Sequence, residues 1–333
     1  MGLFRRRLKT IPKFDENGRF AGSVRQLPPP DVGARRAAAL DGSPLPVLVW
    51  PPPGMEIPEL PPEMADVGPY GPNAATVQLL VASGLVVPIV EVDPEANWAD
   101  DTPLSEVVFC VLDTETTGTD PTVDSIVEVG VVTMRGDGTV LDRWSTTVCP
   151  SNGWVTGTQI HGIDRETMAG SPTFDEVLRP LVARMSGKPI LAHNTNFDVN
   201  MLWAEFERCG YQAGATVAVD TRDLAALHGF ESQKLGDLAA VYGLVNEAAH
   251  RAWADAEVCG NLLSVMAPPL GVATVHDLCQ VVEVNDGFPG DWPEPQVSDE
   301  VRARMRSARQ DVLSGKVPDR PDAMRGVRWS KTS

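Results

Sequence analysis

The stretch VVFCVLDTETTG, residues 107–118, decides the fold of this chain. Its first six residues are apolar and rich in valine, so they predict a buried strand that runs directly into Asp113. Because side chains alternate along a strand, Asp113 and Glu115 face the same side. Two carboxylates this close repel each other, and a hard oxygen-binding cation relieves the repulsion. The pair therefore predicts a metal site, although a strand end with two solvated acids has the same local sequence.

A second block, HNTNFD, follows at residues 193–198. The short apolar run over 189–192 predicts a strand before it, and the apolar periodicity over 197–209 predicts a helix after it. Asp198 then falls in the first turn of that helix. A carboxylate there also gains from the helix dipole, so Asp198 alone indicates no more than an ordinary helix start.

A third block, HRAWAD, lies at residues 250–255. Its histidine and its acid are five residues apart, which is about 140° around a helix, so they cannot share a helical face. We therefore place His250 in the loop before a helix that Asp255 opens. A lone histidine is more often a surface or structural residue than a base, but a neutral imidazole beside acids suits a general base near neutral pH.

The segments between the blocks predict further strands. Residues 126–134 are strand-like, turn residues follow at 135–138, and the chain returns over 139–141, which favours an antiparallel meander of the first three strands. Residues 219–221 indicate the end of a later strand before another helix. The order of elements is that of an α/β domain with a mixed sheet.

In order and spacing the three blocks resemble the DEDDh family of 3′-to-5′ exonucleases, which includes the proofreading subunit of bacterial replicative DNA polymerase. The resemblance covers residues 107–266, about half of the chain. It implies a ribonuclease H-like α/β fold: a mixed five-stranded central sheet, its first three strands antiparallel, with helices on both faces. The acids would collect at the C-terminal end of the first strand.

The resemblance also implies the roles of single residues. Two Mg²⁺ ions, for which Mn²⁺ can substitute, would bind the four acids, and His250 would deprotonate the attacking water. The catalytic residues expected in this way are Asp113, Glu115, Asp198, Asp255 and His250. The substrate-binding residues expected are Thr116, Thr117, Asn194 and His161; we expect a structural or substrate-contacting role for His161 rather than a catalytic one.

The expected activity is removal of nucleoside 5′-monophosphates from the 3′ end of single-stranded or frayed DNA, in proofreading or repair with a separate DNA polymerase as partner. Two alternatives stay open. Relatives with the same five residues trim RNA, and the blocks do not read the sugar. The chain could also be a polymerase-binding module without activity, although such a module has no chemical reason to keep all five residues.

Charge is distributed unevenly over a chain of net charge −17. Residues 1–40 hold nine Lys and Arg against three acids, and residues 301–333 hold the same numbers. Residues 107–300 hold ten bases against 28 acids, so the predicted catalytic region is a poor electrostatic partner for nucleic acid except through its metals. The basic ends would supply phosphate attraction or merely solubility, and the sequence favours neither.

We expect four segments: a basic disordered tail over 1–40, an acidic proline-rich linker over 41–105 with a small docked segment at 74–92, the exonuclease domain over 106–268, and a C-terminal extension with a basic tail over 269–333. Within the extension, Val301 to Leu313 predicts a basic helix with a thin apolar stripe that could bind a partner or nucleic acid, or fray.

Five cysteines without close pairing argue against a disulfide framework or a zinc module and indicate a reducing cytoplasm. The apolar run over 74–92 is broken by Pro88, so we expect no membrane span, and the first residues carry no apolar segment of the kind found in a signal peptide.

Overall fold

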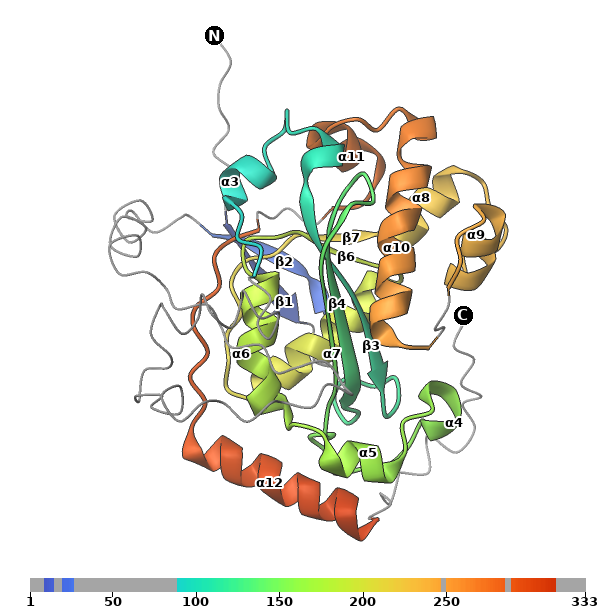
Figure 1. Ribbon diagram of the computed structural model, residues 1–333. Helices are drawn as coiled ribbons and strands as arrows, with labels where there is room; N and C mark the ends of the chain where they lie inside the picture. Colours follow the sequence, from blue (N-terminus) through green and yellow to red (C-terminus); the bar gives the residue numbers. More distant parts are fainter. Residues whose placement is uncertain (1–8, 15–19, 27–88, 247–249, 285–288, 316–333) are drawn as a thin grey trace, which may run out of the picture.

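The computed structural model describes residues 9–14, 20–26, 89–246, 250–284 and 289–315 (Figure 1). Its centre is a five-stranded sheet with the strand order β5-β4-β3-β6-β7. The strands are β3 (Val108–Thr116), β4 (Ile126–Arg135), β5 (Val140–Thr147), β6 (Ile190–Ala192) and β7 (Ala218–Asp220). β3, β4 and β5 are antiparallel, and β6 and β7 run parallel to β3. This confirms the predicted ribonuclease H-like sheet.

Side chains of the central strand β3 alternate between two hydrophobic clusters, one on each face of the sheet. Cys110 and Leu112 belong to the cluster that β3 shares with α6 (Phe174–Met185) and α7 (Thr195–Arg208). Phe109 and Val111 belong to the cluster on the other face, which includes residues of α10 (Ala252–Met266). By the same alternation, Asp113 and Glu115 continue the row that faces α10.

Helices therefore cover both faces of the sheet (Figure 1), as predicted. On the α10 side lie α8 (Thr221–Leu227), α9 (Leu235–Val241) and α11 (Val275–Val281), whose residues Leu224, Leu238 and Leu278 are buried in the second cluster. The connections are α4 (Thr158–His161), α5 (Arg165–Gly170) and two 3-10 turns at Leu104–Glu106 and Pro268–Leu270.

The predicted basic helix near the C-terminus is α12 (Asp299–Ser314). Its apolar stripe is Val301, Met305 and Val312, and all three side chains are buried. Arg309 of the same helix donates to the carbonyl of Ser171, just past the end of α5. The stripe is therefore used within the chain, and the helix lies along α5 (Figure 1).

Part of the expected linker packs on the domain. Trp98, which follows α3 (Pro94–Asn97), is buried and meets the ring of Phe109 edge to face at 6.1 Å. Asn97 donates to the carbonyl of Val108 at 2.9 Å and accepts from its N–H at 2.7 Å. These contacts cap the start of β3, so residues 94–98 form one body with the predicted domain.

The expected disordered tail contains an antiparallel hairpin, β1 (Lys9–Phe14) and β2 (Phe20–Gln26). The sequence between the strands includes Asn17-Gly18, which is a strong short-range indication of a hairpin that outweighs the polar composition. The other expected flanking features, including most of the segment at 74–92 and the end of the basic tail after residue 315, lie outside the described residues.

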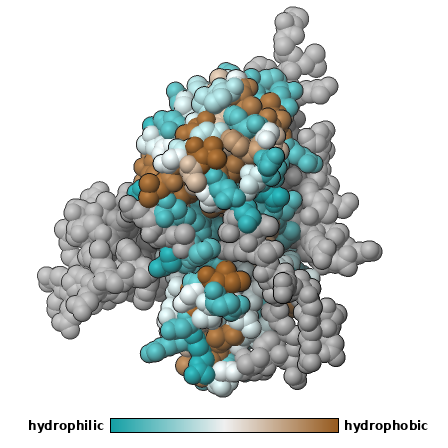
Figure 2. Space-filling model, turned by 90° about the vertical axis from the view of Figure 1, so that its right-hand side faces the viewer, coloured by the Kyte–Doolittle hydropathy of each residue, from teal (hydrophilic) through white to brown (hydrophobic). Residues whose placement is uncertain are grey.

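The described surface mixes hydrophobic and hydrophilic residues on the side of α8, α9 and α10 (Figure 2). The large apolar side chains of Leu227, Val241 and Val245 are exposed in these elements or directly after them. In the part of the chain that the structure describes, no helix is long and apolar enough to cross a membrane. All five cysteines are free thiols, and four of them are buried.

Candidate active site

A pocket of about 960 Å³ opens at the C-terminal end of β3. The three blocks of the sequence meet there, because β3 ends at the first block, α7 begins in the second and α10 begins in the third. Every residue expected at the site lines this pocket: Asp113, Glu115, Thr116, Thr117, His161, Asn194, Asp198, His250 and Asp255.

The first two acids come from the α10 side of β3. In the register with β4, Asp113 lies opposite Gly130 and Glu115 lies opposite Glu128. Glu115 is only 2% exposed, whereas Asp113 is partly exposed. Glu115 is therefore a buried carboxylate with Asp113 on the same face of the strand, and such a pair of acids is stabilised by a positive group or a cation nearby.

The third acid, Asp198, is in the first turn of α7, as predicted. The preceding Asn194 adopts a left-handed conformation, with φ of 71°, and its N–H donates to Asp220 at 3.0 Å. The N–H of Thr195 donates to the same carboxylate. Asp198 is in turn fixed to β3, because the N–H and the hydroxyl of Thr114 both donate to its Oδ1, at 2.9 and 2.8 Å.

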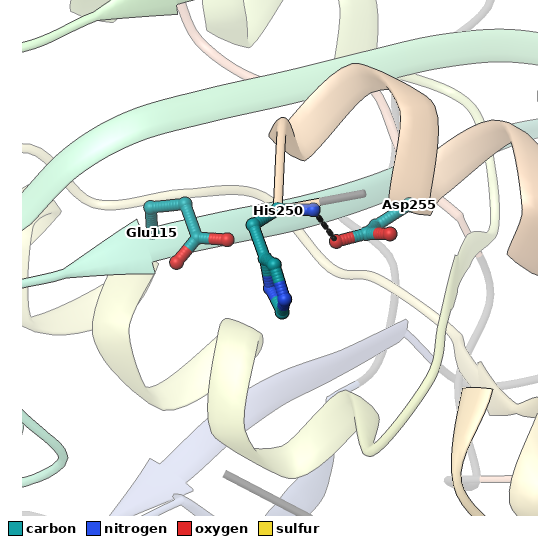
Figure 3. Close-up of side chains that lie close together, drawn as sticks. All are labelled: Glu115, His250 and Asp255. Atoms are coloured by element: carbon teal, nitrogen blue, oxygen red, sulfur yellow. Dashed lines mark hydrogen bonds between the residues drawn. The ribbon is translucent and has the colours of Figure 1, made fainter. Parts of the chain in front are cut away.

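The fourth acid and the histidine belong to one turn (Figure 3). His250 lies before α10 in a left-handed conformation, with φ of 68°, and its backbone N–H donates to Oδ2 of Asp255 at 3.1 Å. Its side chain is exposed, whereas Asp255 is 8% exposed. Asn246 donates to Oδ1 of Asp255 at 2.6 Å. Sequence reasoning missed Asn246, since no local pattern links it to an acid nine residues later.

Three of these side chains have the geometry of a cation site. Glu115, His250 and Asp255 each offer one ligand atom, and these atoms all lie within 4.8 Å of one another. Figure 3 shows the ring of His250 between the two carboxylates. Carboxylate oxygens suit Mg²⁺ and Mn²⁺, so this donor set fits a divalent ion. The imidazole of His250, which we expect to act as a base, therefore also lies where it could bind the metal ion.

Two residues expected to bind substrate have strong internal contacts. The hydroxyl of Thr117 accepts from the N–H of Ser125, and its carbonyl accepts from the hydroxyl of Thr156. His161 is 5% exposed, and its Nδ1 accepts from the N–H of Ile163 at 3.0 Å. Nε2 must then carry the proton, which it directs to the carbonyl of Thr156 at 3.3 Å. These contacts support the structural interpretation of His161.

Residues 231–236, which the sequence did not indicate, also line the pocket. His193 holds this segment, because its Nε2 lies 2.6 Å from the carbonyl of Gln233 and must donate to it. Its Nδ1 then accepts from the hydroxyl of Thr221 at 2.8 Å. Burial lowers the pKa of His193 below its ordinary value, so the ring is neutral. Among the described residues, Arg222 and Lys234 are the arginine and lysine that line the pocket.

The sheet order and the four acids that line one pocket at the end of β3 are those of a ribonuclease H-like nuclease. A family model described as Exonuclease matches residues 110–263. DNA polymerase III subunit epsilon of Treponema pallidum (strain Nichols) is 35% identical over 165 residues, covering 48% of this chain and 76% of the relative. The chain belongs to this family, the DEDDh 3′-to-5′ exonucleases, whose members use divalent metal ions.

Other similar proteins are larger or more distant. PolC-type DNA polymerase III of Thermotoga maritima is 33% identical over 168 residues, which make up 50% of this chain but 12% of the relative. Among solved structures, the nuclease domain of 3′hExo, a DEDDh family member bound to rAMP, has a TM-score of 0.45 and 18% identity, covering 53% of this chain and 97% of that chain.

Proposed function

We propose that the chain removes nucleoside 5′-monophosphates one at a time from the 3′ end of single-stranded or frayed DNA, in a reaction that requires Mg²⁺. The observation that carries the proposal is the meeting of Glu115, His250 and Asp255 within 4.8 Å, in a pocket that Asp113 and Asp198 also line. DNA is favoured over RNA because the relatives at 33% to 35% identity are DNA polymerase III proteins.

The four carboxylates Asp113, Glu115, Asp198 and Asp255 would hold two divalent ions, with Mn²⁺ able to replace Mg²⁺. Such a pair of ions stabilises the charge that develops on the attacking and leaving oxygens of an in-line displacement at phosphorus. The protein's own contribution is preorganisation. Thr114 fixes Asp198, and Asn246 with the N–H of His250 fixes Asp255, before substrate arrives.

His250 would take the proton of the attacking water. A general base must lie within hydrogen-bond reach of the proton that it removes, and an exposed ring beside Glu115 and Asp255 can reach a water at this centre. Its place among the acids also allows a ligand role. The base assignment is the one we propose, because a neutral imidazole accepts a proton near neutral pH.

The remaining lining would hold the terminal nucleotides. The volume of about 960 Å³ is in the range of pockets that enclose a small ligand. Thr116, Thr117 and Asn194 are proposed to contact the nucleotide, with His161 supporting that side of the pocket. Arg222 and Lys234 are proposed to bind backbone phosphates and so offset the acidic charge of the domain.

The partner that we propose is a DNA polymerase in the cytoplasm. The relatives' names support the polymerase, and the five free thiols fit a reducing compartment. In such a complex the exonuclease would act on mispaired primer ends. A duplex with a mismatched 3′ terminus should then lose its last nucleotides faster than a fully paired duplex.

The deciding experiment is digestion of matched 5′-labelled single-stranded DNA and RNA with Mg²⁺, with a chelator and Asp113→Ala as controls. We expect a ladder that shortens from the 3′ end of DNA and disappears in both controls. Preferential loss of RNA would overturn the DNA assignment and make the chain an RNA-trimming enzyme. No ladder on either substrate, from protein shown to be folded by circular dichroism, would overturn the activity and favour a binding module.

A further inference from the structure

The first turn of α10 lies directly on strand β4. Gly130 faces this turn, because a Cβ atom at Gly130 would lie 2.2 Å from the backbone nitrogen of Trp253 and 2.3 Å from the carbonyl carbon of Ala252. No real Cβ contact is that short, so the absence of a side chain lets the helix approach. Glu128 is two residues earlier on β4 and therefore lies on the same face of the sheet.

Glu128 is fully buried and forms an ion pair with the residue that follows His250. Nη2 of Arg251 lies 3.1 Å from Oε1 of Glu128, and Nε donates to the same oxygen at 3.1 Å. The hydroxyl of Ser145 also donates to this oxygen, at 3.0 Å. Glu128 does not line the pocket, so its contacts are with the turn and the sheet rather than with substrate.

The turn at His250 needs such support. A residue other than glycine in a left-handed conformation is strained and persists only where surrounding contacts hold it. Two contacts flank the strained residue: the N–H of His250 donates to Asp255, and the side chain of Arg251 donates to Glu128. Of these two contacts, only the one between Arg251 and Glu128 joins the turn to β4, on which Glu128 lies opposite Glu115.

We propose that Glu128 and Arg251 are positioning residues, whose ion pair fixes the turn so that the imidazole of His250 stays between Glu115 and Asp255. The inference rests on the proposed function, in which His250 is the base. A fully buried acid costs desolvation even when it is paired, and its partner is 45% exposed, so the pair contributes little net stability. Its placement beside the catalytic turn is what gives it a role.

The test is steady-state cleavage of single-stranded DNA by Glu128→Gln and Arg251→Lys in the full chain. Glutamine keeps the contact with Ser145 but loses the charge, and lysine keeps the charge but loses the planar fork. We expect Glu128→Gln to lower kcat by about 10- to 100-fold and leave KM within about twofold, with Arg251→Lys losing less. Melting temperatures establish whether each variant is folded. If Glu128→Gln does not fold, the kcat of Arg251→Lys tests the inference.

A matched control removes a different ion pair between α10 and the sheet. Glu257 of α10 accepts from Arg143 of β5 at 2.7 Å, and within the described residues it forms no hydrogen bond or ion pair with His250 or Arg251. Glu257→Gln should therefore change kcat by less than about twofold, as expected for a pair with an exposed arginine. If Glu257→Gln lost as much kcat as Glu128→Gln, the inference would be overturned, because the loss of any ion pair between α10 and the sheet would then lower kcat.

A double variant separates this inference from the proposed function. If Glu128 acts through His250, adding Glu128→Gln to His250→Ala should lower kcat by less than about twofold more. A further large loss in that background would show that Glu128 acts elsewhere, for example through Glu115, and would overturn the inference. Wild-type kcat in Glu128→Gln, with activity lost in His250→Ala, would overturn the inference alone. Wild-type kcat in His250→Ala would overturn the proposed function.

Discussion

The pocket has two walls that are built differently. The inner wall consists of the end of β3 and the starts of α7 and α10, and its acids Glu115, Asp198 and Asp255 are 2% to 8% exposed. The outer wall consists of residues 155–161 and 231–236, where Glu231 and Lys234 are exposed. One wall is fixed by a sheet and two long helices, whereas the other consists of the four-residue helix α4, the start of α9 and loop residues whose carbonyl groups accept hydrogen bonds from side chains.

This difference suggests a division of labour. Reacting groups must be held within a fraction of an ångström, which regular elements and their packed neighbours achieve better than loops do. Substrate contacts tolerate more variation, and loops carry them in many enzymes. Changes in the inner wall should therefore act on kcat, and changes in the outer wall on KM.

The largest effect should follow from removing a reacting group of the inner wall. We expect His250→Ala to lower kcat by about 10²- to 10⁴-fold, the usual contribution of a general base, with the fold intact. Asp198→Ala should nearly abolish cleavage, and it also leaves the N–H of Thr114 without its acceptor, at a cost of about 1–3 kcal/mol. Single-turnover rates and circular dichroism measure the two effects separately. A rate close to wild type in either variant would remove that residue from the catalytic set.

A smaller effect should follow from loosening the inner wall without removing a reacting group. Thr114→Val deletes the hydroxyl that donates to Asp198 at 2.8 Å but keeps the backbone bond at 2.9 Å. We expect kcat to fall by about tenfold with KM little changed, as for other groups that orient a metal ligand. Thr114→Ser, which keeps the hydroxyl, should stay near wild type. Equal losses in both would show that the methyl group matters and not the hydrogen bond.

The same division explains which parts of the site the sequence could predict. The inner wall is local: an apolar run ends at Asp113, and helical periodicity begins beside Asp198 and Asp255, so each acid is marked by its own element. The outer wall is not local. Lys234 reaches the pocket because His193 binds the carbonyl of Gln233, forty residues along the chain. No period or motif encodes that contact.

Strand prediction shows a related limit. The return strand was expected only over 139–141, whereas β5 runs from Val140 to Thr147. Its later residues, 142–147, are all polar except Trp144, which is buried between Arg143 and Ser145, so no continuous apolar run marks the strand. The central strand β3 is apolar on both faces because both are covered, and the sequence therefore showed it clearly.

In the outer wall, Lys234→Ala should raise KM for single-stranded DNA several-fold and leave kcat unchanged. Removing one phosphate contact should also reduce the slope of log affinity against log salt by about 0.7 for a single strand. Arg302→Ala, at an exposed position of α12 that does not line the pocket, is a matched loss of one positive charge. If both variants change KM equally, net charge rather than a phosphate contact explains the effect.

The smallest expected effect concerns His193, which holds the two walls together. Burial lowers the pKa of His193 below the ordinary value of 6.5. The imidazole of His193 therefore binds a proton more readily in the unfolded chain than in the folded one. Protons therefore favour unfolding, and the stability that the neutral ring provides is present at pH 7.5 and declines as the pH falls below about 6.5. His193→Gln can still donate to Gln233 and accept from Thr221 but does not titrate. The melting temperature of wild type should exceed that of His193→Gln at pH 7.5, and this difference should shrink as the pH is lowered to 5.

The control is His276→Gln, which removes an exposed histidine on α11. A difference for His193→Gln that stays constant over this range would mean that the ring accepts a proton in place, and that the outer wall is held as well by the charged ring as by the neutral one.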